Sequence, residues 1–355
     1  LGRGGAWLDT GSIKDFYDSA LSEVIVLPII DENIKLVIDE LNWADVVLFG
    51  PGLSQNSNSI KWMASVLKLI KKPLILDASG FLPISKKIIN YIREQGGLLS
   101  ESDFGSMSSE WVEPLKTNYR GYELYEVPPN TQGLTALICL NILENFNISN
   151  FAYGSVEHLH FLIESMKLSF ADRDRFIADP KMEDVPIESL LKKEYSKKRK
   201  QLIQLDKASN FSPGNLPNSS DTIYLTTSDE DGNMCSFINS VFQHFGSGVT
   251  ASDTGVVLQN RGFGFSLDPS HPNCIAPGKR PFHTIIPGFV MKDERPFLSF
   301  GVMGGDMQVQ GHVQVLSNIV DFGMNIPIPI QSFRVCKLLI LKTLFFVRNI
   351  FVTLS

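Results

Sequence analysis

Residues 207–242 read KASNFSPGNLPNSSDTIYLTTSDEDGNMCSFINSVF, and this stretch decides how the rest of the chain is interpreted. Its first part, Lys207–Ser220, carries two prolines and several asparagines and serines, a composition typical of a loop. Two strand-like runs follow, Thr222–Ser228 and Met234–Phe242, and an Asp-Gly turn separates them. The sequence therefore predicts a long polar loop that ends directly at a β-hairpin.

Thr222, the first residue of this hairpin, has two interpretations. Threonine at the start of a strand is usually there because its β-branched shape suits an extended backbone. Cleavage between Asp221 and Thr222 would instead expose an α-amine beside the threonine hydroxyl, and that amine can act as the general base that activates the oxygen. The position directly after a long polar loop favours the second interpretation, in which Thr222 is a nucleophile.

A glycine pair lies further along the chain, in the run FGVMGGD at residues 300–306. Gly304 and Gly305 fall between a predicted strand at 297–301 and a predicted helix at 307–321, where a tight turn is the simple interpretation. Backbone N–H groups near a helix N-terminus can also form an oxyanion hole for the tetrahedral intermediate of acyl transfer. Combined with Thr222, the oxyanion hole is the more coherent interpretation.

Other polar residues are weaker candidates when each is considered alone. Ser240 lies on the return strand of the hairpin, where it is expected to face Thr222 and hydrogen-bond its hydroxyl. His283 and Thr284 follow a Lys-Arg-Pro sequence and are candidates to line a pocket, although a histidine beside a phenylalanine is more often a packing residue. The cluster Asp172–Arg175 on its predicted helix is interpreted as a solvated or salt-bridged face.

Hydrophobic periodicity predicts an α/β architecture for the whole chain. Residues 1–80 show the alternating strand and helix pattern of a parallel sheet, with strands near 23–28, 44–50 and 73–77 and helices near 33–41 and 59–70. Residues 84–210 are predicted to be mostly helical, with amphipathic patterns at 85–95, 133–146, 155–176 and 187–203. After the hairpin, strands are predicted near 255–259, 283–290 and 297–301. This order favours a four-layer α/β sandwich over a Rossmann sheet.

Composition limits the classes of function. The chain has 355 residues, 43% hydrophobic and 20% charged, and its net charge of −6 is not concentrated in a block, which favours a small-molecule partner over nucleic acid. No charged and apolar leader is visible, so a cytoplasmic location is expected. Lysine and arginine side chains interrupt the apolar, acid-free tail 326–355, so a membrane span is not favoured. The four cysteines have no zinc-site spacing, and no metal is expected: Cys139, Cys235, Cys274 and Cys336.

The motifs of residues 85–325 resemble those of the gamma-glutamyltransferase family of Ntn hydrolases. Around the hairpin the similar runs are DTIYLT at 221–226, DGN at 231–233 and FGSG at 245–248. Upstream they are GGLL at 96–99, WVEP at 111–114, YRGY at 119–122, VPPN at 127–130 and FADR at 170–173. Downstream they are LQNRG at 258–262, FSLDP at 265–269, PGKRP at 277–281 and MGGD at 303–306. So many motifs in the same order make the resemblance specific.

The resemblance implies a role for each matching residue. Thr222 corresponds to the nucleophile that autoproteolysis releases, and Ser240 stands where a threonine assists it. Gly304 and Gly305 match the oxyanion glycines. The candidate substrate-binding residues are His283, Thr284 and Arg261.

The chain departs from the glutathione-cleaving members at two positions of the substrate pocket. Gly264 stands where those members hold an aspartate that binds the α-amino group of the substrate, and Phe242 replaces a substrate-contacting asparagine. The run RGFGFS at 261–266 is instead similar to the branch related to cephalosporin acylases. The carboxylate-binding arginine of the family normally lies in a part that this chain lacks.

Residues 1–82 resemble a different family, the ADP- or ATP-dependent NAD(P)H-hydrate dehydratases of the ribokinase-like superfamily. The similar runs are EVIVLP at 23–28, ADVVLFGPGL at 44–53 and KPLILDASG at 72–80. Gly50 and Gly52 would let the backbone approach a phosphate, so ADP, ATP or NAD(P)H is a possible ligand of this segment. No cofactor is expected for the transferase-like region.

These resemblances imply three segments, namely a ribokinase-like segment 1–83, a gamma-glutamyltransferase-like region 84–325, and an apolar tail 326–355 outside the family. The middle region would divide into a large-subunit part 84–221 and a small-subunit part 222–325. The expected function is a glutathione hydrolase-like amidohydrolase. It would be cleaved at Asp221-Thr222, form an acyl-enzyme on Thr222 from a small amide or gamma-glutamyl substrate, and transfer the acyl group to water or an amine. The alternative is a catalytically incomplete fusion or truncated protein that retains only nucleotide binding.

Overall fold

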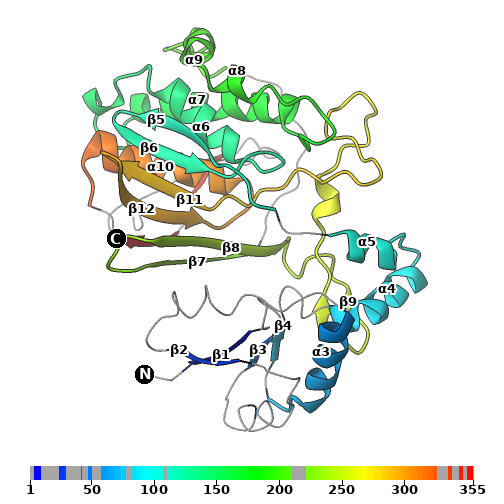
Figure 1. Ribbon diagram of the computed structural model, residues 1–355. Coiled ribbons are helices and arrows are strands. Elements are labelled where there is room, and N and C mark those ends of the chain that lie inside the picture. Colours follow the sequence, from blue (N-terminus) through cyan, green and yellow to red (C-terminus); the bar gives the residue numbers. More distant parts are fainter. Residues whose placement is uncertain are drawn as a thin grey trace. The chain divides into compact units, whose positions relative to one another are not determined.

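The computed structural model divides the chain into two compact units (Figure 1). One comprises Leu1–Ser109 with Thr250–Val256, and the other comprises Glu110–Val249 with Val257–Ser355. This division falls at a different place from the predicted boundary at residue 83. The residues that the structure describes are 57–72, 82–107, 110–209 and 221–325, together with Leu41 and short strands at 4–8, 24–28, 47–49, 74–76, 335–337, 344–346 and 350–354.

The first unit contains parallel strands at the three predicted places, and a further strand, β1, that the sequence analysis did not predict. β1 (Gly4–Leu8) pairs in parallel with β2 (Val24–Pro28), and β3 (Val47–Phe49) pairs in parallel with β4 (Leu74–Leu76). Helix α3 (Ser57–Leu69) connects β3 to β4 and buries Trp62, Met63 and Val66 in a cluster with Phe49. The unit also holds α4 (Ser85–Glu94), α5 (Glu101–Ser106) and β9 (Thr250–Ala251). Gly50, Gly52 and most of the predicted helix at 33–41 lie outside the described residues.

The second unit is built on a five-stranded antiparallel sheet of order β15-β12-β11-β6-β5. Helices cover one face of this sheet, and the β7–β8 hairpin lies on the other (Figure 1). The unit therefore shows three of the four predicted layers among the described residues. The sheet strands are β5 (Leu115–Tyr119), β6 (Tyr122–Glu126), β11 (Gly288–Lys292), β12 (Arg295–Val302) and β15 (Ile350–Leu354); the helices are α6 (Gly133–Leu143), α7 (Val156–Phe176) and α10 (Met307–Phe322); the hairpin strands are β7 (Asp221–Ser228) and β8 (Met234–Phe242).

Successive residues of β12 point to opposite faces of the sheet, so this strand contacts both the helices and the hairpin. Phe300 and Val302 point toward α10, where the Phe300 ring lies 4.4 Å from the His312 ring and a Cβ at Gly311 would approach Val302 to 2.6 Å. The alternate residues of β12 face the hairpin. Ser299 accepts a hydrogen bond from the Thr226 side chain of the hairpin, and the Tyr224 ring packs on Gly301. One strand thus fixes both the helical layer and the hairpin, as the period-2 geometry of strands allows.

Helix α6 forms the centre of the core. It is apolar around its whole circumference, and all of its residues are buried, as expected for a helix that is enclosed on every side. It contacts β5 and β6 of the sheet, α7 and α10 beside it, and the short helices α8 (Ile187–Leu191) and α9 (Lys193–Lys200).

The prediction of a mostly helical segment at 84–210 is wrong at residues 115–126, which form the β5–β6 hairpin. Arg120 and Gly121 make its turn with φ angles of +51° and +89°, the left-handed conformation that two-residue hairpin turns require. β6 pairs with β11, more than 160 residues further along the chain, so the place of this hairpin in the sheet is set by non-local pairing. The single helix predicted at 187–203 is interrupted at Lys192, whose ψ of 133° is extended. The strand predicted at 283–290 begins only at Gly288, and the one predicted at 255–259 is reduced to β10 (Val256–Val257).

Residues 326–355 contribute the strands β13, β14 and β15, of which the structure describes the backbone but not the side chains. β13 (Val335–Lys337) pairs with β14 (Leu344–Phe346), and β15 pairs antiparallel with β12 at the edge of the large sheet. Two short 3-10 helices complete the second unit, η2 (Ile148–Asn150) and η3 (Arg261–Gly264). Among the described residues, no helix combines the length and the apolar content needed to cross a bilayer, and no group of three or more His, Cys, Asp or Glu side chains is placed to hold a metal ion.

The contact between Gly301 and Tyr224 can be tested by adding a single methyl group. A Cβ at position 301 would lie 2.3 Å from the Tyr224 ring, so Gly301→Ala must displace the hairpin from the sheet. We expect a loss of about 1–3 kcal/mol in the free energy of unfolding, measured by urea denaturation. Gly105→Ala is the control, because nothing lies within 4 Å of that position. Equal free energies of unfolding for the two variants would contradict the packing described here.

Candidate active site

Thr222 lies at a β-bulge at the start of the hairpin. Asp221 pairs with Phe242 and Ile223 pairs with Asn239, so one residue of β7, Thr222, stands opposite two residues of β8, Ser240 and Val241. The predicted hairpin is confirmed, and its backbone register places Ser240 beside Thr222. The side chains of Asp221 and Thr222 lie outside the described residues.

The direction of the hairpin brings its Thr222 end toward the glycine pair. Thr226 donates a hydrogen bond to Ser299 at 2.7 Å, and two residues closer to Thr222 the ring of Tyr224 covers Gly301. Moving toward Thr222 along β7 therefore means moving toward the C-terminal end of β12. The glycine pair follows directly after that end, so these two sequence-predicted features lie at the same end of the two sheets.

Gly304 and Gly305 form the link between β12 and α10. Their φ angles of +114° and +57° are conformations that residues with a Cβ rarely adopt. The carbonyl groups of both residues accept hydrogen bonds of 3.0 Å from the first turn of α10, from Met307 and Gln308. Neither glycine N–H donates a hydrogen bond within the described part of the chain, so both N–H groups are available to an anion at this helix N-terminus.

Gln132 anchors the loop that carries Gly304 and Gly305, called the glycine loop below. The sequence analysis did not identify Gln132 as a residue of the site. Its side-chain amide is fully buried and donates hydrogen bonds of 2.8 Å to the Thr284 carbonyl and 2.9 Å to the Gly305 carbonyl. Its own oxygen accepts a hydrogen bond of 3.2 Å from Arg173. One glutamine therefore ties a predicted substrate-binding residue to a predicted oxyanion glycine. Gln132 directly precedes α6, a position at which sequence alone suggests only a helix start.

Arg173 is buried, whereas its sequence cluster was interpreted as a solvated or salt-bridged face. Only 1% of the side chain is exposed, and it forms ion pairs of 2.8 Å with both Asp174 and Asp306. Burial raises the pKa of the Asp306 carboxyl group, which Arg173 opposes. The salt-bridged interpretation is thus correct in its chemistry, but Arg173 is not on a solvated face, because its side chain lies against Gln132, Phe282 and Asp306.

His283 occupies a largely enclosed position near Arg261. Its backbone N–H donates to the Asn130 carbonyl at 3.1 Å, and its buried ring Nδ1 has no hydrogen-bond partner among the described residues. Burial lowers the pKa of His283 to about 4, and the charges of Arg261 and Arg280 act in the same direction. His283 is therefore neutral at neutral pH. Thr284, the next residue, is buried.

Arg261 opens η3 and reaches the residues beside Thr222. Its Nη2 donates to the Ser240 carbonyl at 3.1 Å, and its guanidinium lies 5.7 Å from the centre of the Phe242 ring. The Ser240 hydroxyl accepts a hydrogen bond of 2.8 Å from the Phe242 N–H. The structure thus brings together Arg261 and Ser240, two residues that the sequence analysis named separately.

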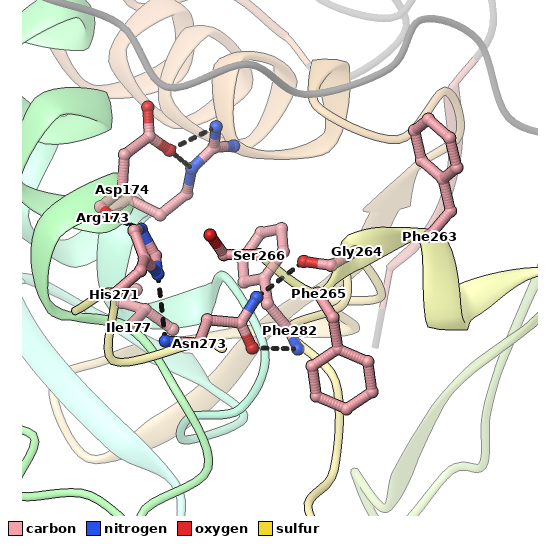
Figure 2. A pocket seen from close by; sticks show the side chains of 10 residues that line it. All are labelled: Arg173, Asp174, Ile177, Phe263, Gly264, Phe265, Ser266, His271, Asn273 and Phe282. Atoms are coloured by element: carbon pink, nitrogen blue, oxygen red, sulfur yellow. Dashed lines mark hydrogen bonds and ion pairs between the residues drawn. The ribbon is translucent and has the colours of Figure 1, made fainter. Parts of the chain in front are cut away.

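A cavity of about 190 Å³ is lined by residues at the end of η3 and the end of α7 (Figure 2). Asn273 shapes it by donating to the Gly264 carbonyl at 2.6 Å and accepting from the Phe282 N–H at 3.1 Å. A Cβ at Gly264 would lie 2.6 Å from the Phe282 carbonyl oxygen, so an aspartate cannot occupy this position without a backbone shift. The lining residues are Arg173, Asp174, Ile177, Phe263, Gly264, Phe265, Ser266, His271, Asn273 and Phe282.

Comparison with known proteins places residues 82–347 in one family model, described as gamma-glutamyltranspeptidase. The matched range begins close to the start predicted for the resemblance, and it continues beyond residue 325. The resemblance of residues 1–82 to an NAD(P)H-hydrate dehydratase stays a prediction.

Curated relatives and solved structures agree with this match. The chain is 41% identical over 242 residues to the glutathione hydrolase-like YwrD proenzyme of Bacillus subtilis, covering 68% of this chain and 46% of that protein. It is 32% identical over 250 residues to the oxamate amidohydrolase proenzyme of Klebsiella pneumoniae, covering 70% and 46%. The crystal structure of a cephalosporin acylase from Bacillus halodurans is similar with a TM-score of 0.67 at 40% identity, over 78% of this chain and 49% of that one. The chain thus spans about half the length of the relatives it matches, and the predicted α/β fold is confirmed.

Gln132 gives a first test of the site. Gln132→Leu keeps the approximate volume but leaves two buried carbonyl groups and one arginine donor without their partner. We expect a loss of about 2–4 kcal/mol in the free energy of unfolding. Gln201→Leu is the control, because Gln201 is exposed. Guanidinium denaturation measures the free energies of unfolding. Similar small losses of this free energy in both variants would show that Gln132 does not stabilise the glycine loop.

His283 gives a second test, through pH. Its pKa is about 4 in the folded chain and about 6.5 when unfolded. The unfolded chain therefore binds the additional proton between these values, and the free energy of unfolding falls as the pH drops from about 6.5 to 4. We expect His283→Gln to remove up to about 3 kcal/mol of this loss. Parallel stability curves for the variant and the unmodified chain across this pH window would rule the effect out.

Proposed function

Because the chain belongs to the gamma-glutamyltranspeptidase family, we propose that it acts as an autoprocessed amidohydrolase with Thr222 as its nucleophile. The observation that carries the proposal is the backbone arrangement: the Thr222 end of the hairpin and the unpartnered N–H groups of Gly304 and Gly305 lie at the same end of the sheets. A nucleophile and an oxyanion hole need this proximity for acyl transfer.

The first proposed step is maturation. The Thr222 hydroxyl attacks the carbonyl carbon of Asp221, the peptide C–N bond breaks, and the acyl group passes to the hydroxyl oxygen as an ester. Water then hydrolyses the ester, which leaves a carboxylate on Asp221 and a free α-amine on Thr222. The products are a large-subunit segment that ends at Asp221 and a small-subunit segment that begins at Thr222.

The second proposed step is acyl transfer. The new α-amine takes the proton of the Thr222 hydroxyl, and the oxygen attacks the amide carbonyl of the substrate. Gly304 and Gly305 donate their N–H groups to the negative oxygen of the tetrahedral intermediate. The C–N bond breaks, the leaving amine receives the proton, and water or another amine then takes the acyl group from Thr222. Ser240 assists the nucleophile, and Arg261, His283 and Thr284 contact the substrate.

The substrate of this reaction is proposed to be a small amide, of gamma-glutamyl or related type. The relatives are named glutathione hydrolase-like, oxamate amidohydrolase and cephalosporin acylase, so members of the family act on amides with different acyl groups. A cytoplasmic location and the lack of a cofactor in the transferase-like region remain our proposals. Nucleotide binding through Gly50 and Gly52 gains no support from the described residues.

Autocleavage tests the proposal directly. On a denaturing gel, the purified chain should resolve into fragments 1–221 and 222–355, and the N-terminal sequence of the smaller should begin at Thr222. Thr222→Ala should remain one band and release no p-nitroaniline from a gamma-glutamyl or other acyl anilide. Thr227→Ala, an exposed threonine on the same strand, is the control and should be cleaved normally. A single full-length band for both the unmodified chain and Thr222→Ala would refute maturation.

A further inference from the structure

Glu126 and His312 form a pair of titratable side chains inside the second unit. Both side chains are fully buried, and Glu126 Oε1 lies 2.6 Å from His312 Nδ1. Glu126 is the last residue of β6, and His312 lies in α10, 186 residues further along the chain. The remaining polar atoms, Glu126 Oε2 and His312 Nε2, are buried and have no hydrogen-bond partner among the described residues. The free energy of the fold therefore depends on the protonation state of this pair.

Two glycines leave the space that the pair occupies. A Cβ at Gly133 would lie 2.8 Å from the Glu126 Cβ, and a Cβ at Gly288 would lie 3.0 Å from the His312 Cε1. The Phe300 ring covers the imidazole, with 4.4 Å between the two ring centres. The elements packed against the pair, α6, β11 and β12, thus contribute glycine backbone and an aromatic ring at this point. Among the described residues, the only ion-pair contact of either side chain is the one between them.

These surroundings disfavour two opposite charges. A buried ion pair offsets its desolvation only when further hydrogen bonds satisfy its remaining atoms, and Glu126 Oε2 and His312 Nε2 have none among the described residues. Burial raises the pKa of the Glu126 carboxyl group, and among the described residues only His312 opposes this rise. A protonated carboxyl group beside an uncharged imidazole keeps the 2.6 Å hydrogen bond and places no charge in the core.

We infer that Glu126 is an uncharged carboxylic acid at neutral pH, that it donates its proton to Nδ1 of a neutral His312, and that both are positioning residues for the glycine loop. The imidazole proton then resides on Nε2. The inference goes beyond the proposed function, because it concerns the protonation state of the core and holds whether or not the chain cleaves itself.

The pair lies between two elements that lead to the glycine loop. The chain runs from Glu126 at the end of β6 to Gln132, whose side-chain amide donates to the Gly305 carbonyl. His312 lies one turn after Gln308 on the same face of α10, and the Gln308 N–H donates to the same Gly305 carbonyl. Ionisation of Glu126 would place a net charge between these two elements. The proton shared with His312 therefore stabilises the position of Gly305.

Glutamine at position 126 tests the protonation state. The unfolded chain ionises Glu126 above about pH 4.3, whereas the folded chain keeps the proton. The folded chain then binds one proton more, so the free energy of unfolding falls as the pH rises from about 4.3 toward the raised pKa of Glu126. Glu126→Gln has the shape of the neutral acid, can donate a hydrogen bond to Nδ1, and cannot ionise. It should not show this fall.

Urea denaturation of the Thr222→Ala chain, followed by circular dichroism, measures the unfolding constant without any cleavage or turnover. Above about pH 4.3 we expect Glu126→Gln to lower this constant, by a factor that grows about tenfold per pH unit until Glu126 ionises in the folded chain. Glu126→Leu lacks the donor and should be less stable than Glu126→Gln. Glu230→Gln, at an exposed glutamate in the turn between β7 and β8, is the control, and its factor should not change with pH.

The carbonyl signal of Gly305 reports on the positioning role. In the Thr222→Ala chain labelled with carbonyl-¹³C glycine, this signal is assigned by its loss in Gly305→Ala. It should shift as the pH rises through the ionisation of Glu126, and Glu126→Gln should abolish the shift. The Gly105 signal is the reference, because nothing lies within 4 Å of a Cβ at that position.

The sign of the stability change separates the two protonation states. If Glu126 and His312 were an ion pair, Glu126→Gln would leave a buried cation without its partner and would raise the unfolding constant at neutral pH, which would overturn the inference. A factor that does not change with pH would overturn it as well. A Gly305 signal that stays fixed while the stability changes as expected would refute the positioning role. Failure of autocleavage would refute the proposed function and leave these measurements unaffected.

Discussion

The packing of the Tyr224 ring on Gly301 is the contact on which the second unit depends. At this point β12 has no side chain, so the hairpin approaches the sheet closely enough for Tyr224 and Thr226 to reach Ser299. On its opposite face the same strand places Phe300 and Val302 against α10. Since the glycine loop begins directly after β12, the position of the hairpin and the positions of Gly304 and Gly305 are set by one strand.

Local signals explain which parts of this fold the sequence could predict. The Asp-Gly turn and the alternating runs beside it identify the β7–β8 hairpin, and the amphipathic patterns identify α4 and α7. The β5–β6 hairpin was missed although Arg120-Gly121 is a favourable turn sequence, because the hairpin is stabilised by the pairing of β6 with β11 across a long stretch of chain. Gln132 was missed for the same reason: its importance lies in hydrogen bonds to Thr284 and Gly305, which are remote in sequence.

Charge compensation distinguishes two arginines of the second unit, Arg173 and Arg261. Arg173 is fully buried, yet its two aspartate partners and the Gln132 oxygen satisfy it within the chain, so it serves to hold the glycine loop. Arg261 is held by the chain through one nitrogen and left unsatisfied at another. Sequence alone does not distinguish these two arginines, because the difference lies entirely in which acids the fold brings near them.

The groups proposed for acyl transfer and the groups proposed for substrate selection lie on different elements. Thr222 and the glycine pair belong to regular structure, a strand bulge and a helix N-terminus, whose geometry is set by the core. Arg261, Gly264 and His283 belong to the irregular segment between β10 and β11, which is shaped by individual hydrogen bonds such as those of Asn260 and Asn273. Substitutions in this segment can change the charge of the pocket without moving the strand bulge or the glycine loop.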